Sequence, residues 1–225
     1  MNLGIITYNF PHLKTEQVLL RLVEMDCQSI QLFALPFKPR KPRKPIIVHR
    51  PFQEAGAHPE EMARKFGLRY QTIDQDHDIP GGLDYYLILG AGILSEEFIR
   101  GKKTINCHPG VIPASRGLDS FKWSIHDQKP LGISLHFIDE KVDAGEIISI
   151  KPTPVFSNDT IESLARRHYE LEIDMTARFQ EFFEKPVNPF EDIAVGEPHM
   201  RMNQETEKVT LAKFKGYLEK FSFKE

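Results

Sequence analysis

The sequence predicts an α/β fold in which a mostly parallel sheet carries helices on both faces. Short apolar runs alternate with segments of helical periodicity along most of the chain, and this alternation is typical of repeated strand–helix–strand units. The 225 residues are enough for one substantial core with a small appendage, but too few for two full domains. We therefore expect one main domain over residues 1–185 and a small C-terminal extension over residues 186–225.

Apolar periodicity places the first elements. Residues 3–8 (LGIITY) are the first predicted strand, and residues 15–25 (TEQVLLRLVEM) are a predicted helix. The apolar face of this helix consists of Val18, Leu19, Leu22 and Val23. Further strands are predicted at SIQLFAL (29–35), RYQTI (69–73), YYLILG (85–90), KTINC (103–107), GISLHFI (132–138) and EIISIKP (146–152).

The last long helix of the main domain is predicted to start at Asp159, with Glu162 three residues further on as in a capping box. Its inward side chains are predicted to be Ile161, Leu164, Leu171, Met175, Phe179 and Phe182. The composition changes after residue 185. The extension, with Gly196 and the segment VTLAKF, is expected to form a small hairpin and a helix.

Composition excludes several classes of function. The formal net charge is −3, so the chain lacks the general basic field that sequence-independent nucleic-acid binding requires. No apolar run approaches the roughly 18 residues of a membrane span, and no signal peptide is evident. Cys27 and Cys107 form no CxxC pair, and a cytoplasmic protein is expected. No metal is expected, because His108, His126 and His136 lack a recognised zinc-ligand spacing.

The segment TINCHPGVIP at residues 104–113 places two polar side chains at the end of a predicted strand. Because side chains alternate along a strand, Asn106 and His108 project to one face while Cys107 projects to the other. This argues against a Cys107–His108 nucleophile pair. Pro109 and Gly110 end the strand, so the two polar residues stand at its carboxyl end, where open parallel sheets keep their ligand crevices.

A carboxylate is offered by the segment HFIDEKVDAGEII, whose predicted loop contains Asp139, Glu140 and Asp143. An amide donor, an imidazole and a carboxylate form a set for acyl transfer that has no nucleophilic side chain. The attacking group must then belong to the substrate. Ser134 and His136 share a face of the preceding strand, and either support of this site or simple packing remains open for them.

These residues carry a resemblance to a known family. The segments NCHPGVIPASRGLDSFKWSI and PLGISLHFIDEKVDAGEII resemble the signature of the folate-dependent formyltransferases, and the similarity is continuous from about residue 83 to 185. This family includes glycinamide ribonucleotide transformylase, methionyl-tRNA formyltransferase and the nucleotide-sugar N-formyltransferases. The resemblance implies a Rossmann-like formyltransferase core as the catalytic domain. It also implies an N-formyltransferase activity with 10-formyltetrahydrofolate as co-substrate and no metal.

The resemblance also assigns site residues. By position, Asn106, His108 and Asp143 match the catalytic triad of the family. Two loops match those that hold the pterin, and the residues carried over are Leu89, Gly90, Ala91, Gly92, Ile93, Leu94, Ile138, Asp139, Glu140 and Asp143.

The amine acceptor is narrowed by departures from the family pattern. Glycinamide ribonucleotide enzymes of this family normally carry a phosphate loop rich in glycine and serine after the first strand. This chain has TYNFPHLKTEQ there instead. Methionyl-tRNA enzymes add a C-terminal barrel, for which residues 186–225 are too few. The resemblance therefore favours a nucleotide-linked deoxyamino sugar, as in surface polysaccharide biosynthesis. Glycinamide ribonucleotide formylation is the first alternative, and a tailoring or folate-binding module acting on a carrier-bound amine is the second.

Acceptor-binding residues are sought outside the motif. Residues 36–51 (PFKPRKPRKPIIVHRP) hold six Lys and Arg with five prolines, which fits either a segment folded over a diphosphate or an extended solvated loop. The candidates for acceptor contact are Phe10, His12, Arg40, Arg43, Arg116 and Trp123. The expected partner is a nucleotide sugar, with neither nucleic acid nor membrane, and homodimer formation stays open.

Overall fold

The computed structural model describes residues 1–27, 29–39, 43–139, 143, 145–190 and 192–223 of the chain. Its main sheet has seven strands in the order β3-β2-β1-β4-β5-β7-β8. These strands are β1 (Asn2–Tyr8), β2 (Ser29–Leu35), β3 (Arg69–Thr72), β4 (Tyr85–Ile88), β5 (Thr104–His108), β7 (Gly132–Phe137) and β8 (Ile147–Pro152). All neighbouring pairs are parallel except those made by β7, which runs antiparallel to both β5 and β8. The predicted α/β class with a mostly parallel sheet is confirmed.

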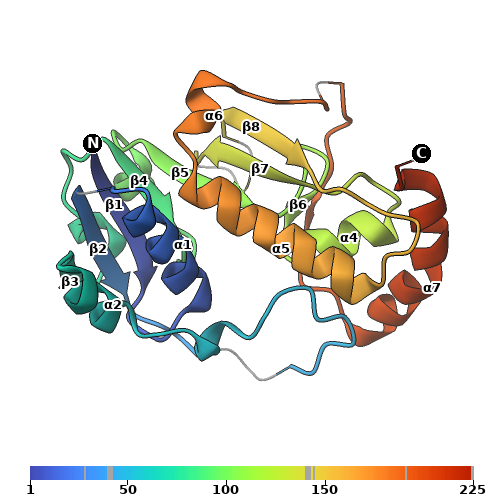
Figure 1. Ribbon diagram of the computed structural model, residues 1–225, viewed down its shortest axis with the longest axis horizontal. Coiled ribbons are helices and arrows are strands. Elements are labelled where there is room, and N and C mark those ends of the chain that lie inside the picture. Colours follow the sequence, from blue (N-terminus) through green and yellow to red (C-terminus); the bar gives the residue numbers. More distant parts are fainter. Residues whose placement is uncertain (28, 40–42, 140–142, 144, 191, 224–225) are drawn as a thin grey trace.

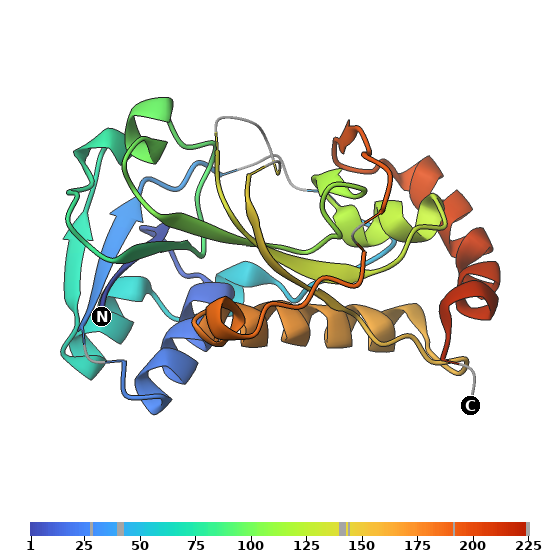
Figure 2. The same ribbon diagram turned by 90° about the horizontal axis from the view of Figure 1, so that it is seen from above.

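Helices cover both faces of this sheet (Figures 1 and 2). The long helices α1 and α5 lie on one side, and α3 and α4 lie on the other, as Figure 2 shows. The helices are α1 (Leu13–Glu24), α2 (Pro59–Phe66), α3 (Glu96–Ile99), α4 (Ser120–His126), α5 (Ile161–Ala177), α6 (Glu181–Glu184) and α7 (Gln204–Phe221). Two short 3₁₀ turns, η1 (Gln53–Ala55) and η2 (Asp76–Asp78), lie in the connections.

Three groups of buried apolar side chains stabilise these layers. The largest joins β1, β2, β4, β5 and β7 to α1, α2 and α5, and a second packs β1, β2 and β4 against α3 on the opposite face. The third joins α4, the start of α5 and the C-terminal helix α7. The predicted apolar face of α1 is largely confirmed, because Val18, Leu19 and Leu22 are buried.

The start of α5 differs from the expectation. Its N-cap is Thr160, whose hydroxyl accepts from the Ser163 amide at 3.2 Å, while the Ser163 hydroxyl accepts from the Thr160 amide at 3.0 Å. Asp159 instead accepts from the Phe156 amide at 2.8 Å and forms a 2.7 Å ion pair with Arg167. Both positions offer a side-chain oxygen three residues before a polar partner, so the pattern alone did not separate them.

The C-terminal extension contains the expected helix, α7, but the expected hairpin is wrong. In the described part of residues 186–223, the one strand is β9 (Pro198–His199), and it pairs in parallel with β6 (Arg116–Gly117) of the main domain. Helix α7 packs beside α4 (Figure 1), with the Tyr217 side chain completely buried. The division of the chain at residue 185 stays a prediction.

Candidate active site

Strand β5 directs its side chains as the alternation predicts. Cys107 points toward α5, where its sulfur lies 3.7 Å from the Glu172 carbonyl oxygen. Asn106 and His108 project to the other face, where they contact groups from β7 and from residue 143. A joint Cys107–His108 nucleophile is thereby excluded, because the two side chains lie on opposite sides of the sheet.

The His108 imidazole is buried and is held at both nitrogens. Nε2 lies 2.8 Å from the Ser115 carbonyl oxygen and 3.1 Å from the Ser120 hydroxyl, and Nδ1 lies 3.4 Å from Oδ1 of Asp143. A carbonyl oxygen can only accept, so Nε2 carries a proton and donates to Ser115. Nδ1 faces the Asp143 carboxylate, so the ring is held in one orientation between Ser115 and Asp143.

Gly110 allows this approach of the Ser115 carbonyl. A Cβ atom at residue 110 would lie 2.7 Å from Nε2 of His108 and 2.7 Å from the Ser115 carbonyl oxygen. Any side chain there would push the carbonyl away from the imidazole. The Pro-Gly turn that follows β5 therefore positions an acceptor for His108 as well as ending the strand.

Asp143 is held from its other side by a backbone amide. The Gly117 N–H donates to Oδ2 of Asp143 at 2.9 Å, so the carboxylate uses one oxygen for the amide and the other for His108. Gly117 has a φ of 84°, which is strained for residues with a side chain. The hydrogen bond from the backbone amide of residue 117 to Asp143 therefore depends on glycine at this position.

His136 determines the orientation of the Asn106 amide. The two residues are paired across β5 and β7, and Nδ2 of Asn106 lies 3.2 Å from Nε2 of His136. Nδ1 of His136 lies 3.0 Å from the Phe137 carbonyl oxygen and must donate to it. Burial, together with the nearby His108, lowers the pKa of His136 to about 4, so the ring is neutral and Nε2 accepts from Asn106. Among the described residues the second N–H of the amide is left unpaired, so it can donate to a substrate oxygen.

The choice left open for Ser134 and His136 now has two different answers. The Ser134 hydroxyl donates to the Gly110 carbonyl oxygen at 2.7 Å and accepts from the Ile112 amide at 3.0 Å, so Ser134 supports the turn after β5. His136, in contrast, contacts Asn106 directly. Its Nε2 also lies 3.9 Å from Asp143 Oδ1, which places one imidazole beside both outer members of the triad.

The two loops carried over as pterin-binding pack against the same group of buried apolar side chains. The amides of Leu89 and Gly90 donate to the Ile6 carbonyl oxygen at 2.9 and 3.1 Å, and the Tyr8 hydroxyl donates to the Ala91 carbonyl at 2.6 Å. Leu94 and Ile138 pack against one apolar cluster. Asp139 is exposed at the surface, and Glu140 lies outside the described residues.

The features of these loops fit a flat heteroaromatic ligand. Ile93 is 94% exposed, and no atom lies within 4 Å of a Cβ built on Gly92. Uncrowded backbone beside an exposed apolar side chain offers a surface on which a flat ring could stack.

The candidate acceptor residues divide into two groups. Phe10 stacks on Phe37 with ring centroids 4.3 Å apart, and His12 Nδ1 lies 2.8 Å from the Thr15 hydroxyl. His12 also packs over Gly90, next to the pterin loop. Burial and the Lys14 ammonium lower the pKa of His12 to about 4.

The second group lies against the C-terminal extension. The Arg43 guanidinium donates to the Met202 carbonyl oxygen. The Trp123 indole donates to the Met200 carbonyl at 2.8 Å and stacks on His199 at 4.2 Å. Arg116 belongs to β6, and Arg40 lies outside the described residues. The structure thus brings His12 to the loop 89–94 and stacks Phe10 on Phe37, but it uses Arg43 and Trp123 to hold the extension.

Sequence reasoning missed a buried polar group behind the site. Lys14 on α1 contacts Glu172 on α5 at 2.5 Å, with side chains only 10% and 5% exposed. Although burial opposes ionisation, the Lys14 ammonium holds the pKa of Glu172 below its usual value. His168 lies one helical turn before Glu172, and its Nε2 is 3.2 Å from the Pro109 carbonyl. The missed signal is a charged or polar residue on the apolar face of each helix.

Residues 39–178 match the family model described as "Formyl transferase", a region of more than half of the chain that contains Asn106, His108 and Asp143. The chain belongs to the formyl transferase family. Its members are enzymes, and this assignment confirms the resemblance seen in the sequence.

Curated relatives of this formyl transferase family member include two phosphoribosylglycinamide formyltransferases. The one from Bacillus subtilis is 37% identical over 73 residues, which are 32% of this chain and 37% of that protein. The one from Haemophilus influenzae is 30% identical over 117 residues, which are 49% of this chain and 55% of that protein. The matches thus span about half the length of these relatives or less.

Solved structures share the Rossmann-like formyltransferase fold. A 4-N formyltransferase from Francisella tularensis superposes with a TM-score of 0.61 at 14% identity, and a sugar N-formyltransferase from Shewanella sp FDAARGOS_354 with 0.60 at 16%. Each match covers 95% of this chain and 87% of the other. The formyltransferase PseJ from Anoxybacillus kamchatkensis, in complex with UDP-4,6-dideoxy-4-formamido-L-AltNAc and tetrahydrofolate, gives 0.51 at 19% identity, covering 71% of this chain and 96% of that one.

None of the helices in the described part of the chain is long and apolar enough to cross a bilayer. The same residues contain no group of three His, Cys, Asp or Glu side chains that could hold a metal ion.

Proposed function

We propose that this protein transfers a formyl group from 10-formyltetrahydrofolate to the amine of a nucleotide-linked deoxyamino sugar. The observation that carries the formyl transfer is the junction of β5 and β7. There, an amide oriented by a neutral imidazole lies beside an imidazole held between a carbonyl and a carboxylate. The β5 cysteine lies on the opposite face, so the nucleophile belongs to the acceptor.

Each side chain has a definite task in this reaction. The neutral amine attacks the formyl carbon, a C–N bond forms, and negative charge develops on the formyl oxygen. The second N–H of Asn106 and the His108 imidazole stabilise that charge. Asp143 holds the imidazole in place, and the proton lost by the amine goes to the folate nitrogen as its bond to the formyl carbon breaks. The products are the formamide and tetrahydrofolate.

The turn after β1 supports a sugar nucleotide as acceptor. Residues 8–13 contain no glycine, so backbone amides cannot wrap closely around a terminal phosphate as in a glycine-rich loop. The turn offers the stacked rings of Phe10 and Phe37 instead, which suit the apolar and aromatic surfaces of a nucleotide. A fold neighbour named as a sugar N-formyltransferase also matches 95% of the chain's length. An enzyme that formylates nucleotide-linked sugars is expected in the cytoplasm.

The alternative acceptor is glycinamide ribonucleotide, because the curated relatives are phosphoribosylglycinamide formyltransferases. The purified chain should be assayed with 10-formyltetrahydrofolate and a panel of amine-bearing deoxysugar nucleotides, with glycinamide ribonucleotide beside them. We expect kcat/KM for the best sugar nucleotide to exceed that for glycinamide ribonucleotide by at least ~100-fold, or about 2.7 kcal/mol in transition-state binding. Equal or faster formylation of glycinamide ribonucleotide would replace the sugar assignment with the alternative.

A further inference from the structure

The turn from residue 116 to residue 120 holds both members of the His108–Asp143 pair. Its Gly117 amide donates to Asp143 Oδ2 at 2.9 Å, and its Ser120 hydroxyl lies 3.1 Å from His108 Nε2. The Ser120 hydroxyl also bonds to the Gly117 carbonyl oxygen at 3.0 Å. A shift of this turn would therefore move the carboxylate and the imidazole relative to each other.

Residues near position 200 hold this turn from outside. Strand β9 pairs with β6, and the Leu118 amide donates to the His199 carbonyl oxygen at 2.8 Å. The fit is close, because a Cβ on Gly117 would lie 2.3 Å from that same oxygen. Asp119 follows with a φ of 56°, an unusual conformation for a residue with a side chain. Its carboxylate accepts from the Met202 amide at 3.2 Å.

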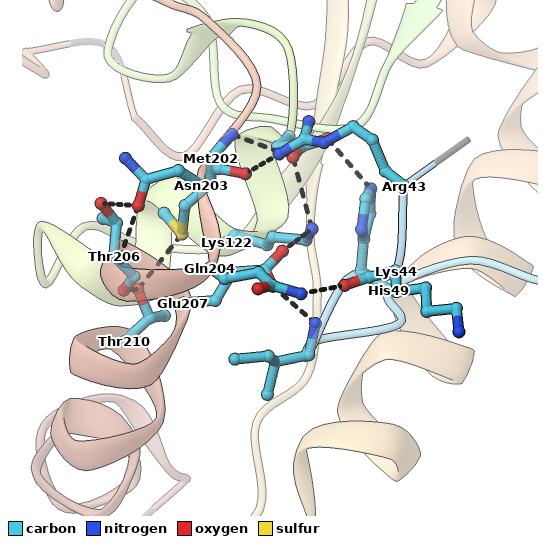
Figure 3. Close-up of polar contacts among 12 residues, drawn as sticks. Arg43, Lys44, His49, Lys122, Met202, Asn203, Gln204, Thr206, Glu207 and Thr210 are labelled. Carbon is cyan, nitrogen blue, oxygen red and sulfur yellow. Dashed lines mark hydrogen bonds and ion pairs between the residues drawn. The ribbon is translucent and has the colours of Figure 1, made fainter. Parts of the chain in front are cut away.

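A buried ionic cluster anchors this part of the chain, as Figure 3 shows. The cluster consists of Asp119, Lys122 and Glu207. The Lys122 ammonium lies 3.3 Å from Asp119 Oδ2 and 2.5 Å from Glu207 Oε1. All three side chains are nearly inaccessible to solvent, with exposures of 7%, 3% and 1%. Glu207 is thus tied through Lys122 to the turn that holds the catalytic pair.

The described end of the basic proline-rich segment lies against the same cluster (Figure 3). The Ile46 amide donates to Glu207 Oε2 at 2.6 Å, and the Gln204 side chain donates to the Lys44 carbonyl oxygen at 2.6 Å. His49 lies 4.0 Å from Asp119. Burial lowers the pKa of His49 well below its usual value, so it adds no charge. The one cation of the cluster therefore serves two carboxylates.

Buried ions are poor general stabilisers, but they discriminate strongly between alternative arrangements. An ion displaced from its partner in a buried site is left without compensation, so neighbouring registers of the same contact are penalised. Apolar packing alone would tolerate a small shift of α7 along α4, whereas the ionic cluster penalises such a shift because it would separate Lys122 from Glu207.

We propose that residues 198–207 are a positioning element for the His108–Asp143 pair, with the ionic cluster fixing their register on the turn 116–120. The inference rests on the proposed function, because it takes this pair to carry out formyl transfer. Its positioning residues are Glu207, Lys122 and Asp119, which act through Gly117 and Ser120.

The decisive variant is Glu207→Gln. Its amide has one acceptor oxygen and one donor group, so in either orientation it presents a donor to Lys122 or to the Ile46 amide. We expect kcat to fall about 10-fold, with the KM for the formyl donor changed less than about 2-fold, because misplacement affects the reacting groups and leaves the pterin loops alone. The control is Glu205→Gln, since Glu205 lies on the same helical turn, is 82% exposed and pairs with Lys208. It should match the parent chain.

A second readout needs no activity. Hydrogen exchange of the Gly117 and Leu118 amides, measured by NMR, reports the bonds to Asp143 and His199. Exchange at both should be at least about 10-fold faster in Glu207→Gln and unchanged in Glu205→Gln. Unchanged exchange would overturn the link between the cluster and the turn. Faster exchange with an unchanged kcat would overturn positioning.

Folding and the proposed function are controlled separately. Rates are measured well below the thermal midpoint of each variant, so a loss of stability alone leaves kcat unchanged. If Glu207→Gln does not fold, Asn203→Ala removes the exposed N-cap of α7, whose side chain accepts from the Thr206 amide at 2.9 Å, and both readouts apply to it. If the parent chain transfers no formyl group, the proposed function fails, while the exchange measurement still decides the structural link.

Discussion

His108 and Asn106 depend on different partners, although they lie on one face of one strand. His108 is held by Asp143 and by the Ser115 carbonyl. Asn106 is held by His136, which is kept neutral by burial. One imidazole is thus held between a carbonyl and a carboxylate, and a second serves as a neutral acceptor that orients an amide.

Replacing His108 by alanine tests the first of these roles. His108→Ala should lower kcat by at least ~100-fold, as the loss of an acid–base group or oxyanion donor typically does, while binding of the formyl donor is retained. Steady-state kinetics and a direct folate-binding titration check both parts. His126→Ala is a suitable control, because His126 pairs with Asp127 near the surface, away from the catalytic pair. Near-normal turnover in His108→Ala would remove this residue from the mechanism.

At the scale of single residues, the sequence predicted which way the β5 side chains point, but it did not predict their hydrogen-bond partners. Alternation along β5 required Asn106 and His108 to share a face, and the structure agrees. The Gly117 amide and the Ser120 hydroxyl could not be foreseen, although both lie within the motif region. Their roles depend on the path of the turn 116–120, which is set by a strand from near residue 198.

At the scale of elements, α5 shows how one capping residue can be mistaken for its neighbour. Asp159 and Thr160 are both good N-cap residues. Asp159 is occupied by the Phe156 amide and by Arg167, which leaves Thr160 to close the capping box with Ser163. An ion pair eight residues away therefore decided the position of the helix start, and local pattern matching cannot include such a contact.

The substitution Thr160→Ala tests this assignment. It should lower the free energy of unfolding by about 1 kcal/mol, because one helix N–H loses its side-chain acceptor. Urea denaturation with an unchanged m-value provides the measurement. Ser157→Ala lies just before the capping box and serves as a comparison that should have a smaller effect. If Thr160→Ala has no effect, the cap is supplied by Asp159 after all.

At the scale of the whole molecule, buried histidines make stability depend on pH. Burial is the main cause that lowers the pKa values of His12, His136 and His168 to about 4 each, against 6.5 in the unfolded chain. Below pH 6.5 these histidines bind protons in the unfolded chain but stay unprotonated in the folded protein until the pH approaches 4. Folding is thus favoured above pH 6.5, and this contribution is lost as the pH falls toward 4.

This sign leads to a measurable slope. Between pH 6 and pH 5, the free energy of unfolding should fall by up to about 1.4 kcal/mol per pH unit for each of these histidines. His168→Gln should reduce the slope by nearly one such contribution, whatever its effect on absolute stability. Urea titrations at a series of pH values test this. An identical slope in the variant would show that His168 titrates normally in the folded chain.

The main sheet was more predictable from the sequence than the C-terminal extension. Strands of the sheet were visible because buried strands are short continuous apolar runs, bounded by turns. The parallel pairing of Pro198–His199 with Arg116–Gly117 left no such trace, because a strand of two residues has no periodicity and its partner is remote in the chain. Local sequence suggested a hairpin within the extension, but its strand pairs instead with a segment of the main domain that is remote in the chain.

That remote pairing has a consequence for the order of events during synthesis. A ribosome delivers Asn106, His108 and Asp143 well before it delivers residues 198–207, and domains begin to fold as they emerge. A nascent chain that has only just passed residue 178 already contains the entire region matched by the family model, yet it lacks the strand that holds Gly117 and Leu118 in place. The contacts that hold the turn 116–120 are therefore made only after the whole matched region has been synthesised, so a chain interrupted before residue 198 carries the complete motif without them.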